Sequence, residues 1–166
     1  MFLGLLFGCS SIDPKIYQAN SPKLDIRKYL NGKLEAHGIL QDRSGKLVKS
    51  FSVKMEGKWQ GNEGTLEEHF IFSDGKKDRR IWKIKFIDDN NFTAQAHDTV
   101  GMAKGQQYGN SLKMDYILTI DVDGKKYDIR LVDWIFLLDK KNAINVTRMS
   151  KFGFTVGKLT ISFKKI

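Results

Sequence analysis

Apolar and polar residues alternate along most of the chain, and this period of two is the dominant pattern of the sequence. Leu112, Met114, Tyr116, Leu118 and Ile120 fall on one side of such a run, and most residues between them are charged or carry a hydroxyl group. Alternation of this kind predicts a β-strand with one buried face, because successive side chains of a strand point to opposite sides. No window shows the 3.6-residue period of a long helix, so we expect only a short helical turn near the N-terminus.

Short segments rich in Gly, Asp and Asn separate the alternating runs. One of them, Asp123-Gly124, is a typical two-residue hairpin sequence. Runs joined by short turns pair with their neighbours in the chain, and they predict an all-β antiparallel meander of roughly eight or nine strands. We expect an up-and-down β-barrel, because closure leaves no strand edge exposed. Such a barrel has an interior that side chains fill or that holds one small ligand.

The first residues of the chain are typical of a bacterial lipoprotein signal. Residues 2–8 are apolar or glycine and stand directly before Cys9, the only cysteine of the 166 residues. This stretch is too short to span a bilayer, which needs roughly 20 apolar residues, but it suits the apolar region of a secretory signal. Leu6 and Gly8 occupy the positions that resemble a lipobox, and Phe7 departs from the small residue usual there. We therefore expect Cys9 to be lipidated.

The chain then divides into three parts. We expect a lipoprotein signal peptide over residues 1–8, a lipidated cysteine and flexible tether over 9–25, and one barrel domain over 26–166. The tether is expected because segment 10–23 is polar and holds both prolines. The alternative is a buried edge strand with a core cysteine. Because no Lys or Arg precedes the apolar stretch, we also expect the true start to lie upstream.

The charge of the chain narrows its partners only slightly. The formal net charge is +9, which suits a nucleic acid, an anionic membrane surface or an acidic ligand. Lys and Arg are spread along the chain, however, and their densest run is KKDRR at 76–80. The segment KFGF at 151–154 lacks the rest of the RNA-binding pattern that contains such aromatics. We therefore expect no nucleic-acid partner, and the oligomeric state stays open.

Several blocks of the sequence resemble a family of bacterial lipoproteins of unknown function from Gram-negative bacteria. These blocks are NGKLEAHGILQDRSGKLVKSFSV, GKWQGNEGTLEEHFIFSDG, RIWKI and MSKFGFTVGKLTISF, and the resemblance extends from about residue 24 onward. The resemblance implies a lipocalin-like or calycin-like barrel and a lipidated cysteine, in agreement with Cys9. It implies no established activity, so no catalytic residue follows from it. The frequent proximity of the family's genes to genes of fatty-acid modification points to lipid chemistry.

Some charged residues are expected to point into the barrel. On each predicted strand we take the more apolar face as the interior, and six charged residues then face inward. They are Lys49, Glu68, Arg80, Asp98, Asp133 and Arg148. Charges inside a barrel are costly unless paired, so three cations beside three carboxylates predict internal ion pairs or a polar ligand site. The alternative is that the three cations reach the barrel rim.

Asp98 is the most informative of these six residues. It lies on a strand predicted over residues 92–103, with small inward residues at Ala94 and Ala96 that leave volume for a ligand. The alternative is a tight bend, which small residues also permit. Arg80 and Arg148 are the expected partners of Asp98. Further along, segment 131–138 is apolar on both faces, so Trp134 is expected under a lid or against a membrane.

The sequence indicates neither a catalytic motif nor a metal site. His37, His69 and His97 fall on the outer faces of their strands and do not converge. Nucleophile-elbow, phosphate-loop and dinucleotide motifs are absent from the sequence, so we expect no cofactor.

The expected function is therefore binding. We expect a lipid-anchored envelope protein, sorted to the outer membrane and facing the periplasm because Ser10 rather than Asp follows Cys9. Its barrel is expected to bind a small amphipathic ligand, a lipid or fatty acid whose anionic head group suits the inward cations. One alternative is an enzyme of lipid modification that uses the inward carboxylates as acid and base. The other is an envelope interaction protein with a filled barrel.

Overall fold

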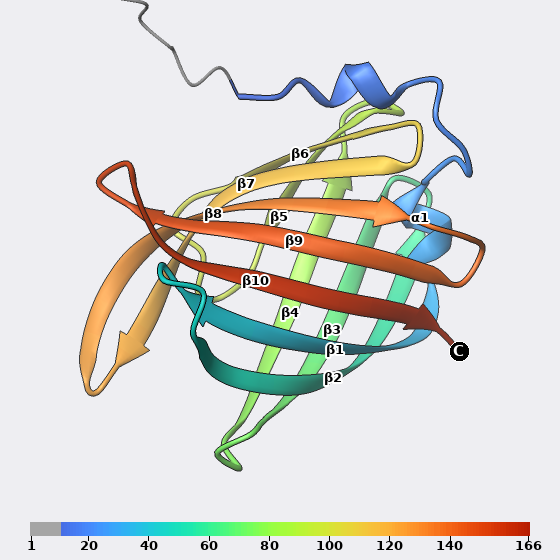
Figure 1. The fold of residues 1–166 in the computed structure, drawn as a ribbon. Helices are drawn as coiled ribbons and strands as arrows, with labels where there is room; N and C mark the ends of the chain where they lie inside the picture. The colour runs from blue at the N-terminus through green and yellow to red at the C-terminus, as the bar shows by residue number, and fades with distance from the viewer. Residues whose placement is uncertain (1–10) are drawn as a thin grey trace, which may run out of the picture.

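The computed structural model describes residues 11–166, which form a closed antiparallel β-barrel (Figure 1). Every strand pairs with its neighbours in the chain, and β1 pairs with β10 to close the barrel. The expected signal peptide and Cys9 lie outside the described residues. The strands are β1 (Gly32–Asp42), β2 (Leu47–Gln60), β3 (Glu63–Phe72), β4 (Lys77–Phe86), β5 (Asn91–Gln95), β6 (Ala103–Tyr108), β7 (Ser111–Val122), β8 (Lys125–Leu137), β9 (Asn142–Lys151) and β10 (Phe154–Lys165).

The closed barrel is confirmed, but the described chain has ten strands rather than eight or nine. The expectation of one strand over residues 92–103 is wrong, because this stretch contains the end of β5 and the start of β6. Between them the hydroxyl of Thr99 donates to the Ala96 carbonyl at 2.8 Å and accepts from the Ala96 amide at 3.1 Å. Because the backbone groups of Ala96 are bonded to Thr99, they cannot pair with a neighbouring strand, and β5 ends there. Gly101 in the same connection has a φ of +73°, which glycine adopts readily.

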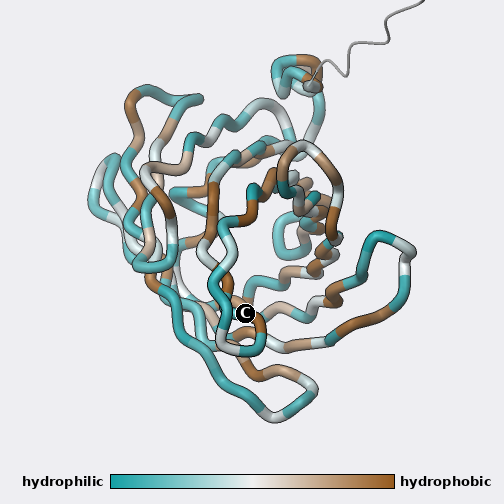
Figure 2. Tube along the Cα trace, turned by 90° about the vertical axis from the view of Figure 1, so that its left-hand side faces the viewer, coloured by the Kyte–Doolittle hydropathy of each residue, from teal (hydrophilic) through white to brown (hydrophobic). Residues whose placement is uncertain are grey.

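The predicted alternation is confirmed on most strands. Leu66, Trp82, Leu118 and Leu131 are buried on β3, β4, β7 and β8, and the residues beside them in sequence are more exposed. Figure 2 shows apolar and polar segments alternating along the strands, viewed from the side on which the hairpins of Figure 1 project. The interior of the barrel is therefore largely apolar, and any charge within it is an exception.

A short helix closes one end of the barrel. Helix α1 (Ile26–Tyr29) begins at Asp25, whose side chain accepts from the Arg27 amide. Ile26, Tyr29 and Leu30 are between 2% and 7% exposed, so α1 fills this end with side chains. Gly57 of β2 permits the close approach, because a Cβ atom there would lie 1.7 Å from the Leu30 carbonyl oxygen.

The segment that precedes α1 lies along the outside of the barrel. It contains the 3-10 helix η1 (Pro14–Tyr17), which contacts β6 and β7. The ring of Tyr17 meets Trp134 and Phe136 edge-on, with centroid distances of 5.7 and 5.4 Å. The apolar outer face of β8 therefore lies under this segment, part of the range expected to be a flexible tether. No helix within residues 11–166 has the length and apolar character needed to cross a membrane.

Candidate functional site

The barrel encloses a cavity of about 670 Å³, which we call the lumen. It extends from Ile26 and Leu30 at the α1 end to Lys49 and Asp123 at the other end. That second end, which we call the mouth, lies where the β1–β2, β3–β4 and β7–β8 hairpins project (Figure 1). The volume falls within the range of small-molecule pockets, about 300–1,000 Å³.

An ion-paired cluster projects into the lumen from β3, β4 and the β5–β6 connection. Arg80 stands opposite Glu68 in the β3–β4 register. Its Nε donates to both oxygens of Asp98 at 3.1 and 3.0 Å, and its Nη2 donates to Oδ2 at 2.7 Å. The second carboxylate is farther away, with Arg80 Nη1 3.6 Å from Glu68 Oε2. The predicted pairing of Asp98 with Arg80 is therefore confirmed, and Asp98 holds this guanidinium by two of its nitrogens.

Asp133 forms a second polar group on the inner face of β8. Tyr116 donates its hydroxyl to Oδ2 at 2.9 Å, and Thr147 donates to Oδ1 at 2.5 Å. Thr147 stands directly opposite Asp133 in the β8–β9 register. The Thr147 hydroxyl also lies 2.8 Å from the side-chain oxygen of Asn145. Both oxygens of Asp133 thus have protein partners within the lumen.

Burial perturbs the ionisation of both groups. Burial raises the pKa of Glu68 to about 7, although the nearby Arg80 charge acts in the opposite direction. Burial likewise raises the pKa of Asp133 to about 6, against the hydrogen bonds from Thr147 and Tyr116. The Oε2 atom of Glu68 is buried and has no hydrogen-bond partner within the described residues. Glu68 is therefore a buried carboxyl group with a raised pKa, and its Oε2 has the Arg80 guanidinium as a charged neighbour.

The structure places the other predicted site residues differently. Lys49 lies at the mouth, where its Nζ is 2.9 Å from Asp74 and 5.1 Å from the centroid of the Phe72 ring. The inward orientation expected for Arg148 is wrong, because its side chain is exposed and its Nε donates to the Thr155 hydroxyl at 2.8 Å. The error concerns the whole of β9, whose more apolar face points outward. The expected balance of three inward cations and three inward carboxylates therefore does not hold.

Three buried polar residues of the lumen are not among the predicted site residues. Tyr116 lies on the inward face that the sequence indicated, so it could have been found as a polar group on that face. Asn145 and Thr147 were missed because the assumption that the more apolar face is buried fails on β9, where both residues are at most 2% exposed. Their positions opposite β8 depend on register, which a single sequence does not provide.

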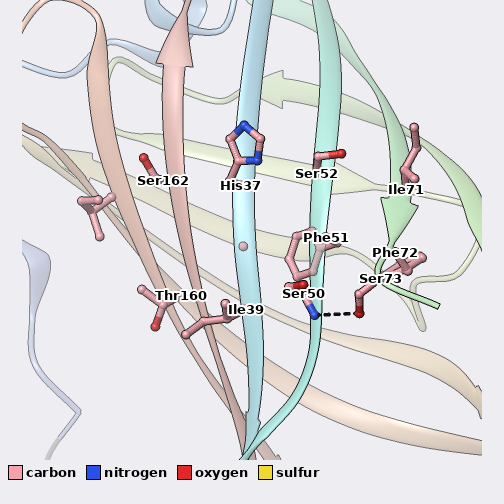
Figure 3. Close-up of a pocket in the computed structure, with 12 residues that line it drawn as sticks. His37, Ile39, Ser50, Phe51, Ser52, Ile71, Phe72, Ser73, Thr160 and Ser162 are labelled. Atoms are coloured by element: carbon pink, nitrogen blue, oxygen red, sulfur yellow. Dashed lines mark hydrogen bonds between the residues drawn. The ribbon is translucent and has the colours of Figure 1, made fainter. Parts of the chain in front are cut away.

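A second hollow lies on the outer surface and is rich in hydroxyl groups (Figure 3). Its volume is about 460 Å³, and it lies over β1, β2, β3 and β10. His37 faces Ser52 and Ser162 across the two neighbouring strands, and the backbone N–H of Ser50 donates to the Ser73 hydroxyl at 3.2 Å. We assign the candidate site to the lumen, because the hollow lacks convergent ion pairs. Among residues 11–166, no three His, Cys, Asp or Glu side chains are arranged to hold a metal ion.

Solved structures with this fold include proteins of very different sequence. The S-type phycobiliprotein lyase CPES from Guillardia theta superposes with a TM-score of 0.65 at 5% identity, over 94% of this chain and 98% of that chain. A protein of unknown function of the DUF3598 family from Nostoc punctiforme gives a TM-score of 0.60 at 11% identity, over 88% of this chain and 51% of that chain. At these identities the likeness shows a shared barrel fold and does not extend to activity.

Comparison of the sequence with curated proteins finds no match. Comparison with protein families finds one, described as a protein of unknown function, over residues 3–165. The match covers nearly the whole sequence, and the chain therefore belongs to the DUF3833 family of proteins of unknown function.

Proposed function

We propose that this protein binds a small amphipathic molecule of lipid type inside its barrel, and that a lipid on Cys9 anchors it to the outer membrane. The observation that carries the binding proposal is the lumen of about 670 Å³, which α1 closes at one end and which opens at the mouth. A filled barrel, the expectation for a purely structural interaction protein, does not fit this volume.

The walls of the lumen suit an apolar chain. They are formed mainly by aliphatic and aromatic side chains from most strands of the barrel, including Phe51, Val53, Met55, Leu66, Phe70, Trp82, Leu118, Leu131, Ile161 and Phe163. Transfer of a hydrocarbon chain from water to such walls is favourable by about 0.8 kcal/mol for each methylene group buried. An acyl chain of ordinary length therefore supplies the affinity expected of a lipid carrier.

The polar groups of the lumen limit the chemistry of the ligand's polar part. Arg80 already donates from two nitrogens to Asp98 and has Glu68 as a second charged neighbour at 3.6 Å. The cluster thus offers an acceptor rather than a free cation. A hydroxyl, amide or amine group would complete it, whereas an ionised carboxylate would meet Glu68, Asp98 and Asp133. The anionic head group expected from the sequence suits the mouth better, where Lys49, Lys76 and Lys77 lie.

A titration with three ligands of equal chain length tests this proposal. Dodecanol, dodecylamine and laurate differ only in their polar group, and each can be titrated in competition with a fluorescent acyl probe. We expect the alcohol and the amine to bind more tightly than laurate at pH 8. If laurate binds most tightly, the polar-group assignment is wrong, and if none of the three displaces a bound probe or binds directly, the binding proposal itself fails.

A pair of neighbouring substitutions places the ligand in the lumen. Ala94 of β5 lines the lumen, while Thr93 beside it lies on the outer surface. Ala94→Phe should reduce binding strongly, and Thr93→Phe should leave it unchanged. Should Ala94→Phe fail to fold, Glu68→Gln provides the second readout. Glu68→Gln should reduce the difference in affinity between laurate and dodecanol, because it removes a carboxylate from the cluster.

An enzyme of lipid modification is the second candidate. It is favoured by the pKa of about 7 of Glu68 inside a cavity, since a general acid or base works best with a pKa near the ambient pH. Against it, both oxygens of Asp133 are held by Tyr116 and Thr147 and both of Asp98 by Arg80, so Glu68 is the one candidate left among the three inward carboxylates of residues 11–166. Chemical change of a bound lipid, abolished by Glu68→Gln with binding retained, would establish the catalytic candidate.

A further inference from the structure

Exposed apolar side chains gather around the mouth of the barrel. Phe152 and Phe154 of the β9–β10 hairpin are 88% and 76% exposed, and the neighbouring hairpins add aliphatic residues that are each about half exposed. These aliphatic residues are Leu47, Val48 and Val122. Single exposed apolar residues are ordinary, but a group of them at one end of a molecule marks an interaction surface.

The opposite end of the barrel has fewer exposed apolar residues. Its connections expose Ile87 and Leu138, without an aromatic side chain. They also carry charges of both signs, Asp88, Asp89 and Asp139 beside Lys140 and Lys141. The exposed apolar surface is thus concentrated at the end where the lumen opens.

Basic side chains flank the apolar residues of the mouth. Those in or beside its hairpins and exposed are Arg43, Lys46, Lys76, Lys77, Lys125 and Lys126. The same turns also carry carboxylates, but the basic residues of the four hairpins outnumber them. Asp42 accepts from Ser44 and Lys46, Asp74 pairs with Lys49, and Asp121 accepts from the Gly124 amide. Apolar side chains among an excess of basic groups match the surface of a bilayer that contains anionic lipids.

We propose that the mouth docks onto an anionic lipid bilayer, with Phe152 and Phe154 inserted among the head groups, so that the lumen opens toward the membrane. Val48 and Val122 belong to both the exposed apolar group and the lining of the lumen. An amphipathic molecule leaving the bilayer would therefore meet a continuous apolar path. The claim that a lipid-type molecule passes through the mouth rests on the proposed function. The claim that the mouth docks onto a bilayer does not depend on it.

Vesicle sedimentation of the full chain carrying Cys9→Ser tests docking without the expected lipid anchor. The test variant is Phe152→Asn with Phe154→Ser, since Asn tolerates the φ of +50° found at residue 152. The control variant is Ile87→Ser with Leu138→Ser, which removes exposed apolar residues from the opposite end. The fraction of the parent chain and of each variant that sediments is measured with phosphatidylcholine vesicles, with and without phosphatidylglycerol.

We expect the parent chain to sediment with the anionic vesicles and more weakly with the neutral ones. The variant that lacks Phe152 and Phe154 should bind the anionic vesicles with a partition coefficient that is lower by about tenfold or more, because two apolar side chains are lost from the contact. The control should change it less than twofold. Docking at the mouth is overturned if the parent and the variant without Phe152 and Phe154 bind the vesicles equally. It is also overturned if the control variant loses as much vesicle binding as that variant. Dodecanol binding in solution, measured on the same variants, should be unchanged, so a failure of docking is distinguishable from a failure of ligand binding.

Discussion

Removal of the Asp98 carboxylate tests whether the polar cluster of the lumen is an enclosed ion pair. Asp98→Ala deletes three hydrogen bonds from Arg80 and leaves the backbone bond between the Asp98 carbonyl and the Thr119 amide in place. The side chains of Arg80 and Asp98 are 17% and 18% exposed. The remaining exposure is toward the lumen, so water or a ligand can partly solvate the guanidinium that is left behind.

The expected loss of stability follows from these contacts. Breaking a buried ion pair by removing one partner costs about 3–5 kcal/mol when the other charge stays unpaired. Arg80 keeps Glu68 as a neighbour at 3.6 Å, and the lumen gives some solvation. We therefore expect Asp98→Ala to lower the free energy of unfolding by about 2–3 kcal/mol. Glu68 should then become the main partner of Arg80, and its pKa should fall below about 7.

Urea unfolding at pH 8 measures this loss against a matched surface carboxylate. Asp115 of β7 also pairs with an arginine, Arg130, but both side chains are substantially exposed. Asp115→Ala should therefore cost less than about 0.5 kcal/mol. Equal midpoints for Asp98→Ala and Asp115→Ala would refute the reasoning, because they would show that the Arg80 pair is no more enclosed than a surface pair.

Three further predictions concern pH, packing and anchoring. Because the pKa of Glu68 rises from 4.5 to about 7 on folding, the folded protein binds the proton more tightly, and stability should fall as pH rises between these values, by up to about 3 kcal/mol. Glu68→Gln should flatten this slope in urea titrations from pH 4.5 to 8, and an unchanged slope would contradict the burial of Glu68. Gly105→Ala should lower stability by about 1–3 kcal/mol in thermal unfolding, because its Cβ would lie 2.0 Å from the enclosed ring of Phe92; a change near zero would show that this ring moves freely. Cys9→Ser should abolish labelling with a palmitate analogue and leave only a weaker membrane association that added salt reduces, whereas sedimentation of the native protein with inner-membrane vesicles would contradict the sorting expected from Ser10.

The sequence predicts those parts of the fold that local patterns determine. Glu68, Arg80 and Asp133 lie on strands with one clearly apolar face, so their inward orientation could be predicted. Arg148 could not be placed correctly, because the inner face of β9 carries Asn145 and Thr147. The Thr147 hydroxyl donates to Asp133 and lies 2.8 Å from the Asn145 side-chain oxygen, and such contacts make a polar inner face tolerable.

Non-local contacts determine the remaining features. The division between β5 and β6 depends on the Thr99 hydroxyl, which could equally have belonged to a strand. The contact between Glu68 and Arg80 depends on the β3–β4 register, and the closure of one end depends on the docking of Ile26 and Leu30. Such pairings cannot be predicted from alternation, because alternation indicates which face of the strand a side chain occupies and not which residue on another strand it contacts.

Native mass spectrometry of the protein extracted from its own membranes in detergent tests the central claim most directly. The account predicts a non-covalent adduct of lipid-like mass on the native protein and on Thr93→Phe, and its loss from Ala94→Phe, whose added ring occupies the lumen. Protein that carries no adduct in any form, or an adduct retained equally by Ala94→Phe in its folded state, would contradict the claim that the barrel binds its ligand inside.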